Sequence, residues 1–581
     1  MIEISCKKDL YTYNAYHLAR AFFPEEEARV LTKPSQKEAV VFDFEPRTAC
    51  GGVGTQKNTC SGEDPDRAGR MDISGNIEEN RAKDRVPAGR MQRIAIAESD
   101  SKDAVDKEVY SALSKVAGRT LPWGLLTGVR PTKPAMKKLK EGMGREEFIA
   151  WYGREKLVSA EKAGKAYDIA QKELCILDKI AAQTVQNDRR RPKAGGGQEE
   201  KNGRKAKAGD QPAGGASCAA ADVRKDTGGT SCTAADAAPL CDGSRLLSHV
   251  PWTDTCSIYI GIPFCPSICS YCSFSLGTAA AYSKRLDAYT DALCREIRLT
   301  ADIVRDKKIS SIYIGGGTPT SLEIPQLERI FKCINECFDV GALAEFCVEA
   351  GRPDSITKEK LAAIKRSGAG RISINPQTMQ EATLERIGRA HSTGDVYRAF
   401  EDARSFGFDN INMDLIAGLP GEGAAEMADT LEKILALDPE SLTVHALSIK
   451  RRARMESQYT KGEEVHRMID LAAQAAARAG LEPYYLYRQK SIAGNFENVG
   501  YAKPGKEGIY NILTMEEVQS IYGLGAGANT KVVLDHAVPN PARGGKAGNI
   551  LRCSNVKDVE EYIKNVEEMV RRKERLTGWI Y

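Results

Sequence analysis

Short apolar runs alternate with longer stretches of helical periodicity between residues 257 and 450. The runs are rich in β-branched residues, which predicts buried strands, and the apolar positions between them recur with the spacing of a helix. We predict strands at residues 257–262, 311–314, 346–350, 371–374, 411–416 and 442–446. Strands that alternate with helices are typical of a parallel sheet with crossover helices. The sequence therefore predicts an α/β fold, for which a partial (β/α)6 barrel is the simplest architecture.

Each predicted strand ends in an unusual group of residues. These groups are the cysteine loop from Cys265, the Gly-Gly-Gly-Thr-Pro-Thr run at 315–320, Glu349, Gln377, Asp414 and His445. In parallel α/β folds, ligand-binding residues gather at the carboxyl ends of the strands because the loops there share one rim. We therefore expect these groups to form one site.

Two stretches with almost no large apolar side chains divide the chain. We predict a flexible insert near 46–91 and a disordered linker at 185–245, because such segments bury too little apolar surface to offset the entropy of ordering. The remaining regions are an N-terminal domain at 1–184, a core at 246–455 and a C-terminal domain at 456–581. The N-terminal domain opens with a strand-like run and a helical pattern at 11–23.

Composition limits the class of protein. The chain has 581 residues, enough for several domains, and its 83 basic and 79 acidic residues give a net charge of +4, which gives no reason to expect a nucleic-acid partner. Apolar stretches are shorter than the roughly 20 residues that span a bilayer, and the first residues carry early charges. We expect a cytoplasmic protein whose sixteen cysteines are mostly free thiols plus a metal site, rather than disulfides.

Cys265, Cys269 and Cys272 form a C-x3-C-x2-C motif directly after the first core strand. Three thiolates in one loop can hold three irons of a 4Fe–4S cluster and leave the fourth iron open. The usual ligand at such an iron is the amino and carboxylate pair of S-adenosylmethionine, which predicts radical chemistry carried by the cofactor. A closed zinc site needs four ligands and no partner Cys or His pair lies nearby, and three thiols do not make a disulfide framework.

Four further polar residues are candidates, each with a simpler alternative. Glu349 could accept the cofactor ammonium or a ribose hydroxyl, or could form an ion pair with Arg352. Gln377 could bond ribose hydroxyls or cap the next helix. Arg389 could bind the cofactor carboxylate or be a solvated cation at a helix end. Asp414 is an acid among apolar residues, which is rare without a partner or a function.

The remaining candidates are weaker. The glycines at 315–317 would let a ligand approach the backbone, and no Lys-Ser/Thr pair follows to make a nucleoside triphosphate loop. His391 and His445 could carry protons, although a lone histidine is more often a packing or surface residue. Cys333 and Cys337, with Cys347 nearby, suggest a second cysteine group, which we interpret as small apolar residues.

At this point the residues resemble the radical S-adenosylmethionine superfamily and, within it, the oxygen-independent coproporphyrinogen III oxidase family. The resemblance fits best the HemZ-like branch, the coproporphyrinogen dehydrogenases, because it extends outside the core to 121–133 and 484–500. The matching core stretches occur in the family's order, at 259–265 with the two following cysteines, 315–320, 348–350, Gln377, 388–392 and 414–420.

The resemblance implies cofactors, site residues and a reaction. The cysteine triplet would bind the 4Fe–4S cluster, and S-adenosylmethionine would contact Tyr259, Tyr271, Gly316, Gly317, Thr318, Glu349, Gln377, Arg389 and Asp414. A 5′-deoxyadenosyl radical would convert two propionates of coproporphyrinogen III to vinyl groups and give protoporphyrinogen IX. The implied partners are the porphyrinogen substrate and a small electron-donor protein such as flavodoxin or ferredoxin.

Two departures keep other functions open. Phe274 stands where well-studied enzymes of the family carry a further cysteine, and the His-Asn-x-x-Tyr-Trp group of the haem-chaperone branch has only Tyr510-Asn511 as its counterpart. A haem-binding delivery protein and a radical enzyme with another substrate are the alternatives. Cations that could contact substrate carboxylates are Arg371, Arg488, Lys490 and Lys503.

Overall fold

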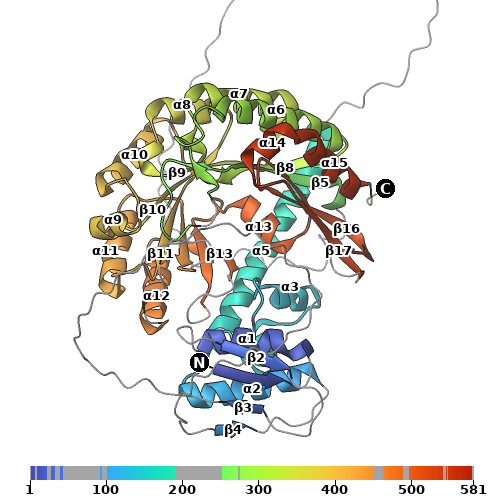
Figure 1. Ribbon diagram of the computed structural model, residues 1–581, viewed down its shortest axis with the longest axis vertical. Coiled ribbons are helices and arrows are strands. Elements are labelled where there is room, and N and C mark those ends of the chain that lie inside the picture. Colours follow the sequence, from blue (N-terminus) through green and yellow to red (C-terminus); the bar gives the residue numbers. More distant parts are fainter. Residues whose placement is uncertain are drawn as a thin grey trace, which may run out of the picture.

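The structure is a computed structural model (Figure 1) that describes residues 2–6, 9–22, 28–32, 40–42, 92–94, 101–190, 252–272, 275–448, 455, 460, 462–488, 496–540, 545 and 547–578. The predicted insert at 46–91 lies wholly outside the described residues, so its character stays a prediction.

 The predicted linker at 185–245 also lies outside the described residues from residue 191 onward. Its first six residues form the end of the long helix α5 (Ala160–Arg190). The predicted domain boundary at 184 therefore falls inside a helix.

Six parallel strands form the centre of the molecule, as predicted. They are β5 (Thr255–Ile262), β8 (Lys308–Gly316), β9 (Glu345–Gly351), β10 (Arg371–Gln377), β11 (Ile411–Ala417) and β12 (Ser441–Ala446). They lie side by side in this order, and each pairs in parallel with the next. The strands curve into an arc with helices along its outer side, which is the predicted partial (β/α)6 barrel (Figure 1).

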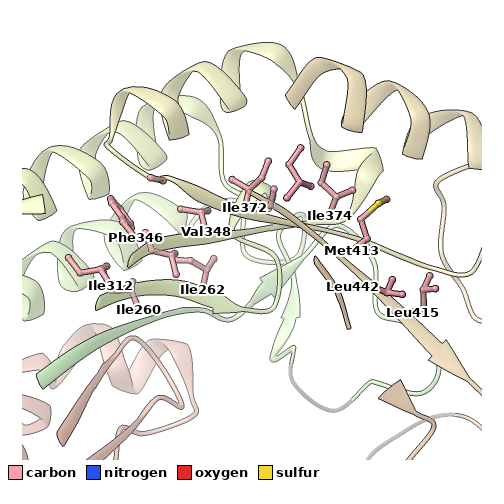
Figure 2. Close-up of a cluster of buried hydrophobic side chains, with 14 of the residues drawn as sticks. Ile260, Ile262, Ile312, Phe346, Val348, Ile372, Ile374, Met413, Leu415 and Leu442 are labelled. Carbon is pink, nitrogen blue, oxygen red and sulfur yellow. The ribbon is translucent and has the colours of Figure 1, made fainter. Parts of the chain in front are cut away.

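Side chains on the six strands alternate between an apolar outer face and a polar inner face. Figure 2 shows the outer face, where Ile260, Ile312, Val348, Ile372 and Met413 belong to one buried apolar cluster beneath the helices. Alternate residues of a strand point to opposite faces, so the residues between them face inward. The covering helices are α6 (Leu286–Ile303), α7 (Ile324–Cys337), α8 (Lys358–Arg366), α9 (Glu381–Arg386), α10 (Thr393–Ser405) and α11 (Ala424–Leu435).

The C-terminal region continues the same sheet at both of its edges. In the described chain the sheet has eleven strands, because β13 (Glu482–Tyr487) and β14 (Asn498–Ala502) extend it beyond β12, and β15 (Ser520–Leu524), β16 (Asn529–Pro539) and β17 (Ala547–Ser554) extend it beyond β5. Helix α12 (Gly462–Arg478) packs on α11, while α14 (Val559–Lys564) and α15 (Val566–Thr577) pack on α6. The sequence did not predict that residues after 455 share the core sheet.

The N-terminal region has its own small core. Strand β1 (Ile2–Cys6) pairs in parallel with β2 (Ala28–Thr32), β3 (Val40–Phe42) pairs with β4 (Gln92–Ile94), and α1 (Asp9–Phe22) packs on α2 (Lys102–Ala117). The predicted opening strand and helix are therefore confirmed. Two short helices, α3 (Lys133–Lys140) and α4 (Arg145–Lys156), pack on α5. None of the helices in the described part of the chain has the length and apolar character needed to cross a bilayer.

Two helices from distant parts of the sequence fill the inner side of the arc. The first residues of helix α13 (Ile509–Glu516) contact β9. The Glu345 carboxylate of β9 accepts hydrogen bonds from the backbone N–H groups of Ile509 and Tyr510, each at 2.9 Å. A carboxylate is favourable there because the first N–H groups of a helix lack intrahelical partners. Helix α5 packs its Ile176, Leu177 and Ile180 into the same small apolar cluster as α13 (Figure 1).

A buried ion pair joins the N-terminal region to the sheet. Glu497, beside β14, accepts hydrogen bonds from Trp123 Nε1 at 2.7 Å and from Lys162 Nζ at 2.8 Å. All three side chains are about 1% exposed or less. Arg488 adds to the junction, since its backbone N–H donates to the Val129 carbonyl at 2.7 Å. The stretches at 121–133 and 484–500 therefore contact each other.

Burial opposes the charged form of Glu497, but Lys162 and Lys165 outweigh it and hold the pKa of this carboxyl at about 2. Glu497→Gln would leave Lys162 charged and buried without its partner, so we expect the free energy of unfolding to fall by about 3–5 kcal/mol. Urea unfolding would measure the loss. Because the folded pKa lies below the ordinary value of 4.5, the contribution of Glu497 should be complete above about pH 4.5 and disappear as the pH falls towards about 2.

The matched control is Glu482→Gln. Glu482 forms an ion pair with Lys172 at 2.7 Å, but its side chain is 59% exposed. Water screens such a pair, so we expect a loss of less than about 1 kcal/mol. Equal losses in the two variants would contradict a special role for the buried pair.

Candidate functional site

The cysteine loop is fixed to the rim of the barrel by backbone hydrogen bonds. After β5 the chain forms the two-residue strand β6 (Phe264–Cys265), which pairs with β7 (Gly277–Thr278). The backbone N–H of Ser270 donates to the Ile387 carbonyl at 3.0 Å, and Arg352 donates to the Ser267 carbonyl at 3.2 Å. The loop is thereby held from the end of β9 and from the end of α9.

The three predicted ligands lie together in this loop as free thiols. Cys265 and Cys269 are buried and Cys272 is partly buried. Burial raises the pKa of the Cys265 thiol, and the nearby Cys272 and Cys269 raise it further, although hydrogen bonds from Thr318 and Ser275 act in the opposite direction. A thiolate at Cys265 therefore needs a compensating positive charge, which a bound metal centre would supply.

The glycines at 315–317 lie where the end of β8 packs closely against neighbouring segments of the chain. A Cβ on Gly317 would lie 2.5 Å from the Phe264 carbonyl oxygen, and one on Gly315 would lie 2.7 Å from Glu349 Oε2. Gly316 has a φ of +108°, which side chains rarely adopt. These protein contacts alone explain the three glycines, so the predicted close approach of a ligand stays a prediction.

Glu349 faces the inner side of the barrel and bonds to a tyrosine rather than to an arginine. The Tyr313 hydroxyl donates to Glu349 Oε1, while Arg352 pairs with Asp354 at 2.8 Å. The alternative of a Glu349–Arg352 ion pair is therefore wrong. Burial raises the pKa of Glu349 to about 7, against the lowering effect of the Tyr313 hydrogen bond.

Three aromatic rings stack beside this carboxylate. The Tyr313 ring lies 4.4 Å from that of Tyr510 and 6.3 Å from that of Tyr259, measured between ring centroids. Tyr510 comes from α13, so a residue of the C-terminal region lies within the predicted cofactor site. The sequence offered no periodic signal that could have placed it there.

Asp414 on β11 has two polar neighbours. Asn412 Nδ2 donates to Asp414 Oδ1 at 2.7 Å, and His445 Nε2 lies 3.9 Å from Asp414 Oδ2. Burial favours the neutral acid, but the polar side chains of His445, Asn412 and Thr443 outweigh it and hold the pKa of Asp414 below its usual value. The predicted acid is thus a partnered carboxylate on the inner face.

Arg389 is buried at the centre of a polar network. It donates to the Tyr271 hydroxyl at 3.1 Å, to the Asn375 carbonyl at 2.7 Å and to His391 Nδ1 at 3.5 Å. With 6% exposure it is not the solvated helix-end cation that we considered. Burial and the charge of Arg389 lower the pKa of His391 to about 4, so this imidazole is neutral near pH 7.

Two buried polar atoms near this network have no hydrogen-bond partner in the described part of the chain. They are Gln377 Oε1 and His391 Nε2. Gln377 also has a φ of +71°, a strained conformation for a residue with a side chain, and the cap of the following helix is Gln380. Buried polar groups normally have partners, and backbone strain gathers at functional sites. Both observations favour a ligand beside β10.

A cavity of about 1120 Å³ opens beside the cysteine loop. Its lining includes Cys272 and Ile268 of the loop and Gly316 and Tyr259 of the barrel. It also includes residues that the sequence did not predict to be near the site, which are 128–130 and 133 from the N-terminal region and 526–531, 552 and 557 from the C-terminal region. The resemblance outside the core was the only sequence signal for the N-terminal part.

The cations predicted to contact substrate carboxylates do not line this cavity. Arg371 donates to Asn410 Oδ1 at 2.6 Å, Arg488 donates to the Leu126 carbonyl at 2.6 Å, and Lys503 pairs with Asp438 at 2.7 Å. These three cations bond to other parts of the protein, and their predicted role at the substrate stays a prediction. Lys490 and Phe274 lie outside the described residues.

The chain is similar to known proteins over most of its length. Residues 259–434 match the model of the Radical SAM superfamily. The oxygen-independent coproporphyrinogen-III oxidase-like protein HemZ of Bacillus subtilis is 35% identical over 480 residues, which are 81% of this chain and 80% of HemZ. The chain belongs to the radical S-adenosylmethionine family of HemZ.

Other members of this family are similar over shorter lengths. The heme chaperone HemW of Bacillus subtilis is 34% identical over 281 residues, which are 47% of this chain and 70% of HemW. Among solved structures, coproporphyrinogen III oxidase HemN of Escherichia coli is 22% identical with a TM-score of 0.45, and the match covers 55% of this chain and 70% of HemN.

Radical S-adenosylmethionine proteins use a 4Fe–4S cluster and S-adenosylmethionine, and the residues present here fit these groups. In the described chain no three His, Cys, Asp or Glu side chains gather as ligands of a single metal ion. Ligands of a 4Fe–4S cluster each bind a different iron, so they need not converge on one point. The thiols of the cysteine loop and the unpartnered Gln377 Oε1 are the donors and acceptors that such groups would meet.

If Cys265, Cys269 and Cys272 are the cluster ligands, Cys269→Ala should lose the brown chromophore, the bound iron and all turnover after anaerobic reconstitution. Cys333→Ala is the matched control, because Cys333 is also buried but lies on α7 with its thiol directed at the Cys294 carbonyl. We expect the control to retain its iron. A cluster spectrum in the Cys269→Ala protein would refute the ligand assignment.

Proposed function

We propose that this protein performs the oxygen-independent oxidative decarboxylation of coproporphyrinogen III, in which two propionate side chains become vinyl groups and protoporphyrinogen IX forms. The observation that carries the proposal is the extent of the similarity to HemZ. It covers about four-fifths of both chains and so must reach beyond residues 259–434. The cavity beside the cysteine loop is likewise built from the N-terminal and C-terminal regions together with the barrel.

Each decarboxylation has a simple balance. A propionate loses one hydrogen atom, carbon dioxide and one further electron to give a vinyl group. When bound and reduced, the cluster and S-adenosylmethionine supply the 5′-deoxyadenosyl radical that takes the hydrogen atom. A small electron-donor protein such as flavodoxin or ferredoxin would deliver the electron that starts the step, and an oxidant of the one-electron class would remove the last electron.

In this proposal the chain's own residues bind and orient the cluster and S-adenosylmethionine. Cys265, Cys269 and Cys272 hold the cluster. Glu349, positioned by Tyr313, accepts a hydrogen bond from the amino group of S-adenosylmethionine, and Gln377 bonds its ribose. Further contacts to this cofactor come from Tyr259, Tyr271, Gly316, Gly317, Thr318, Arg389 and Asp414. The partial exposure of Cys272 to the cavity brings substrate close to the cluster.

A haem-binding delivery role is the second candidate, and the 34% identity to heme chaperone HemW favours it. The position that corresponds to the chaperone histidine is Tyr510, whose ring stacks on Tyr313. A tyrosine held in an aromatic stack is a poorer haem ligand than an exposed histidine, which counts against this candidate.

The decisive experiment incubates the reconstituted protein anaerobically with reductant, S-adenosylmethionine and coproporphyrinogen III. We expect 5′-deoxyadenosine and carbon dioxide to form together. If 5′-deoxyadenosine forms without carbon dioxide, the radical chemistry stands and the substrate is wrong. If neither forms while the cluster is intact and haem binds stoichiometrically, the delivery role replaces the proposal.

Binding of S-adenosylmethionine should strengthen as the pH rises. Burial holds the pKa of Glu349 at about 7, and its ionised form is the stronger hydrogen-bond acceptor for the amino group. Equilibrium dialysis should show affinity increasing from about pH 6 to about pH 7.5, and Glu349→Gln should weaken binding at least about tenfold and reduce this pH dependence. Protonation of the amino group of S-adenosylmethionine itself affects binding to the parent protein and to the variant equally. A difference between the two pH profiles therefore comes from Glu349. An identical pH profile in the variant would remove Glu349 from the cofactor site.

A further inference from the structure

The charged side chains that line the cavity are nearly all cationic. Among the described residues the lining has one carboxylate, Glu517, and five cations. The cations are Arg130, Lys133, Lys531, Arg552 and Lys557. They come from the N-terminal region and from the strands that follow α13, so the sheet and the N-terminal region together build this wall.

Glu517 is shared by three of these cations. It accepts a hydrogen bond from Arg552 at 2.8 Å, it bonds Arg130, and Lys531 Nζ lies 3.7 Å away. One carboxylate therefore offsets three positive charges. Glu517 itself ends α13 with a φ of +51°, so the chain holds it in an uncommon conformation at this point.

Part of the positive excess, at Lys531 and Arg130, is held close to the protein interior, whereas Arg552 and Lys557 are exposed. The side chains of Lys531 and Arg130 are 12% and 18% exposed. Burial lowers the pKa of Lys531 to about 8, and Arg552 and Arg130 lower it further despite Glu517. In the described chain neither Lys133 nor Lys557 has a carboxylate within ion-pair distance. An anion in the cavity would relieve this repulsion.

The same cavity also reaches the cluster loop and carries apolar surface. Its lining includes Cys272, Ile268 and Leu276, and Val129 at its edge is 42% exposed. A ligand that suits this lining is a large, mostly apolar molecule with several carboxylates. Its carboxylates would meet the cationic wall, and its apolar body would lie towards the cysteine loop.

We propose that Lys531, Arg552 and Lys557 bind carboxylates of the tetrapyrrole substrate, with Arg130 and Glu517 positioning Lys531 and Arg552. This inference rests on the proposed function, which names a substrate with four propionates. It explains how a substrate can be held while one propionate reaches the cluster. A protein partner fits less well, because Lys531 and Arg130 lie within a cavity and are less than one-fifth exposed.

Porphyrin binding to the cluster-containing protein tests the inference directly. Coproporphyrin III, the oxidised form of the substrate, has four carboxylates and protoporphyrin IX has two. Fluorescence titration should show that Lys531→Met weakens binding of coproporphyrin III by about tenfold or more, since a hydrogen bond to a charged group is lost. Protoporphyrin IX should lose less. Lys557→Met is the second variant, because its exposed side chain is not needed for folding.

Lys506→Met is the matched control, because Lys506 pairs with Asp409 at 3.0 Å and does not line the cavity. We expect it to bind both porphyrins like the parent protein. Unchanged coproporphyrin III binding in both Lys531→Met and Lys557→Met would overturn the inference. Binding of an acidic ferredoxin that depends on these lysines, with no porphyrin binding, would overturn it as well.

Turnover separates this inference from the proposed function. Lys531→Met should lose decarboxylation while 5′-deoxyadenosine formation without substrate and S-adenosylmethionine affinity stay unchanged. If the parent protein binds coproporphyrin III through Lys531 but releases no carbon dioxide, the carboxylate site stands and the proposed reaction falls. If the parent decarboxylates and the lysine variants do so with unchanged KM, the reaction stands and the carboxylate site falls.

Discussion

Burial of only one face of the six parallel strands under helices is the constraint on which the structure depends. Apolar residues such as Ile260 and Val348 occupy that face, so the residues between them point inward by the geometry of a strand. Parallel sheets in barrels usually have apolar residues on both faces. Here the inner face carries Tyr259, Glu349 and Asp414, and those residues need partners because water is largely excluded from them.

The partners of the inner face come from outside the barrel. Glu345 receives the first backbone N–H groups of α13, and the stacking of Tyr510 on Tyr313 follows from that anchoring. A helix from the C-terminal region therefore completes the predicted cofactor site. At the rim, Gln377 Oε1 and His391 Nε2 remain without partners in the described chain, which marks where a ligand would complete the hydrogen bonding.

The cavity depends on the junction between the N-terminal region and the sheet. Glu497 ties Trp123 and Lys162 to β14, and this fixes the segment that carries Arg130 beside the end of α13. The cationic wall can then form from residues that are about four hundred positions apart, Arg130 and Arg552. The cavity is therefore lined by cations as well as by the cysteine loop, and this arrangement would orient a bound ligand.

The sequence by itself determined the six core strands and the cysteine loop. Apolar periodicity and C-x3-C-x2-C spacing are local patterns, and local patterns can be recognised without knowledge of the fold. Only the tertiary structure decided that Glu349 bonds Tyr313 rather than Arg352, that residues after 455 share the core sheet, and that Lys531 and Arg552 line the cavity while Arg371 and Arg488 do not. Each of these depends on which distant segments pack together, because a side chain's partners are set by strand register and helix packing and not by its neighbours in sequence.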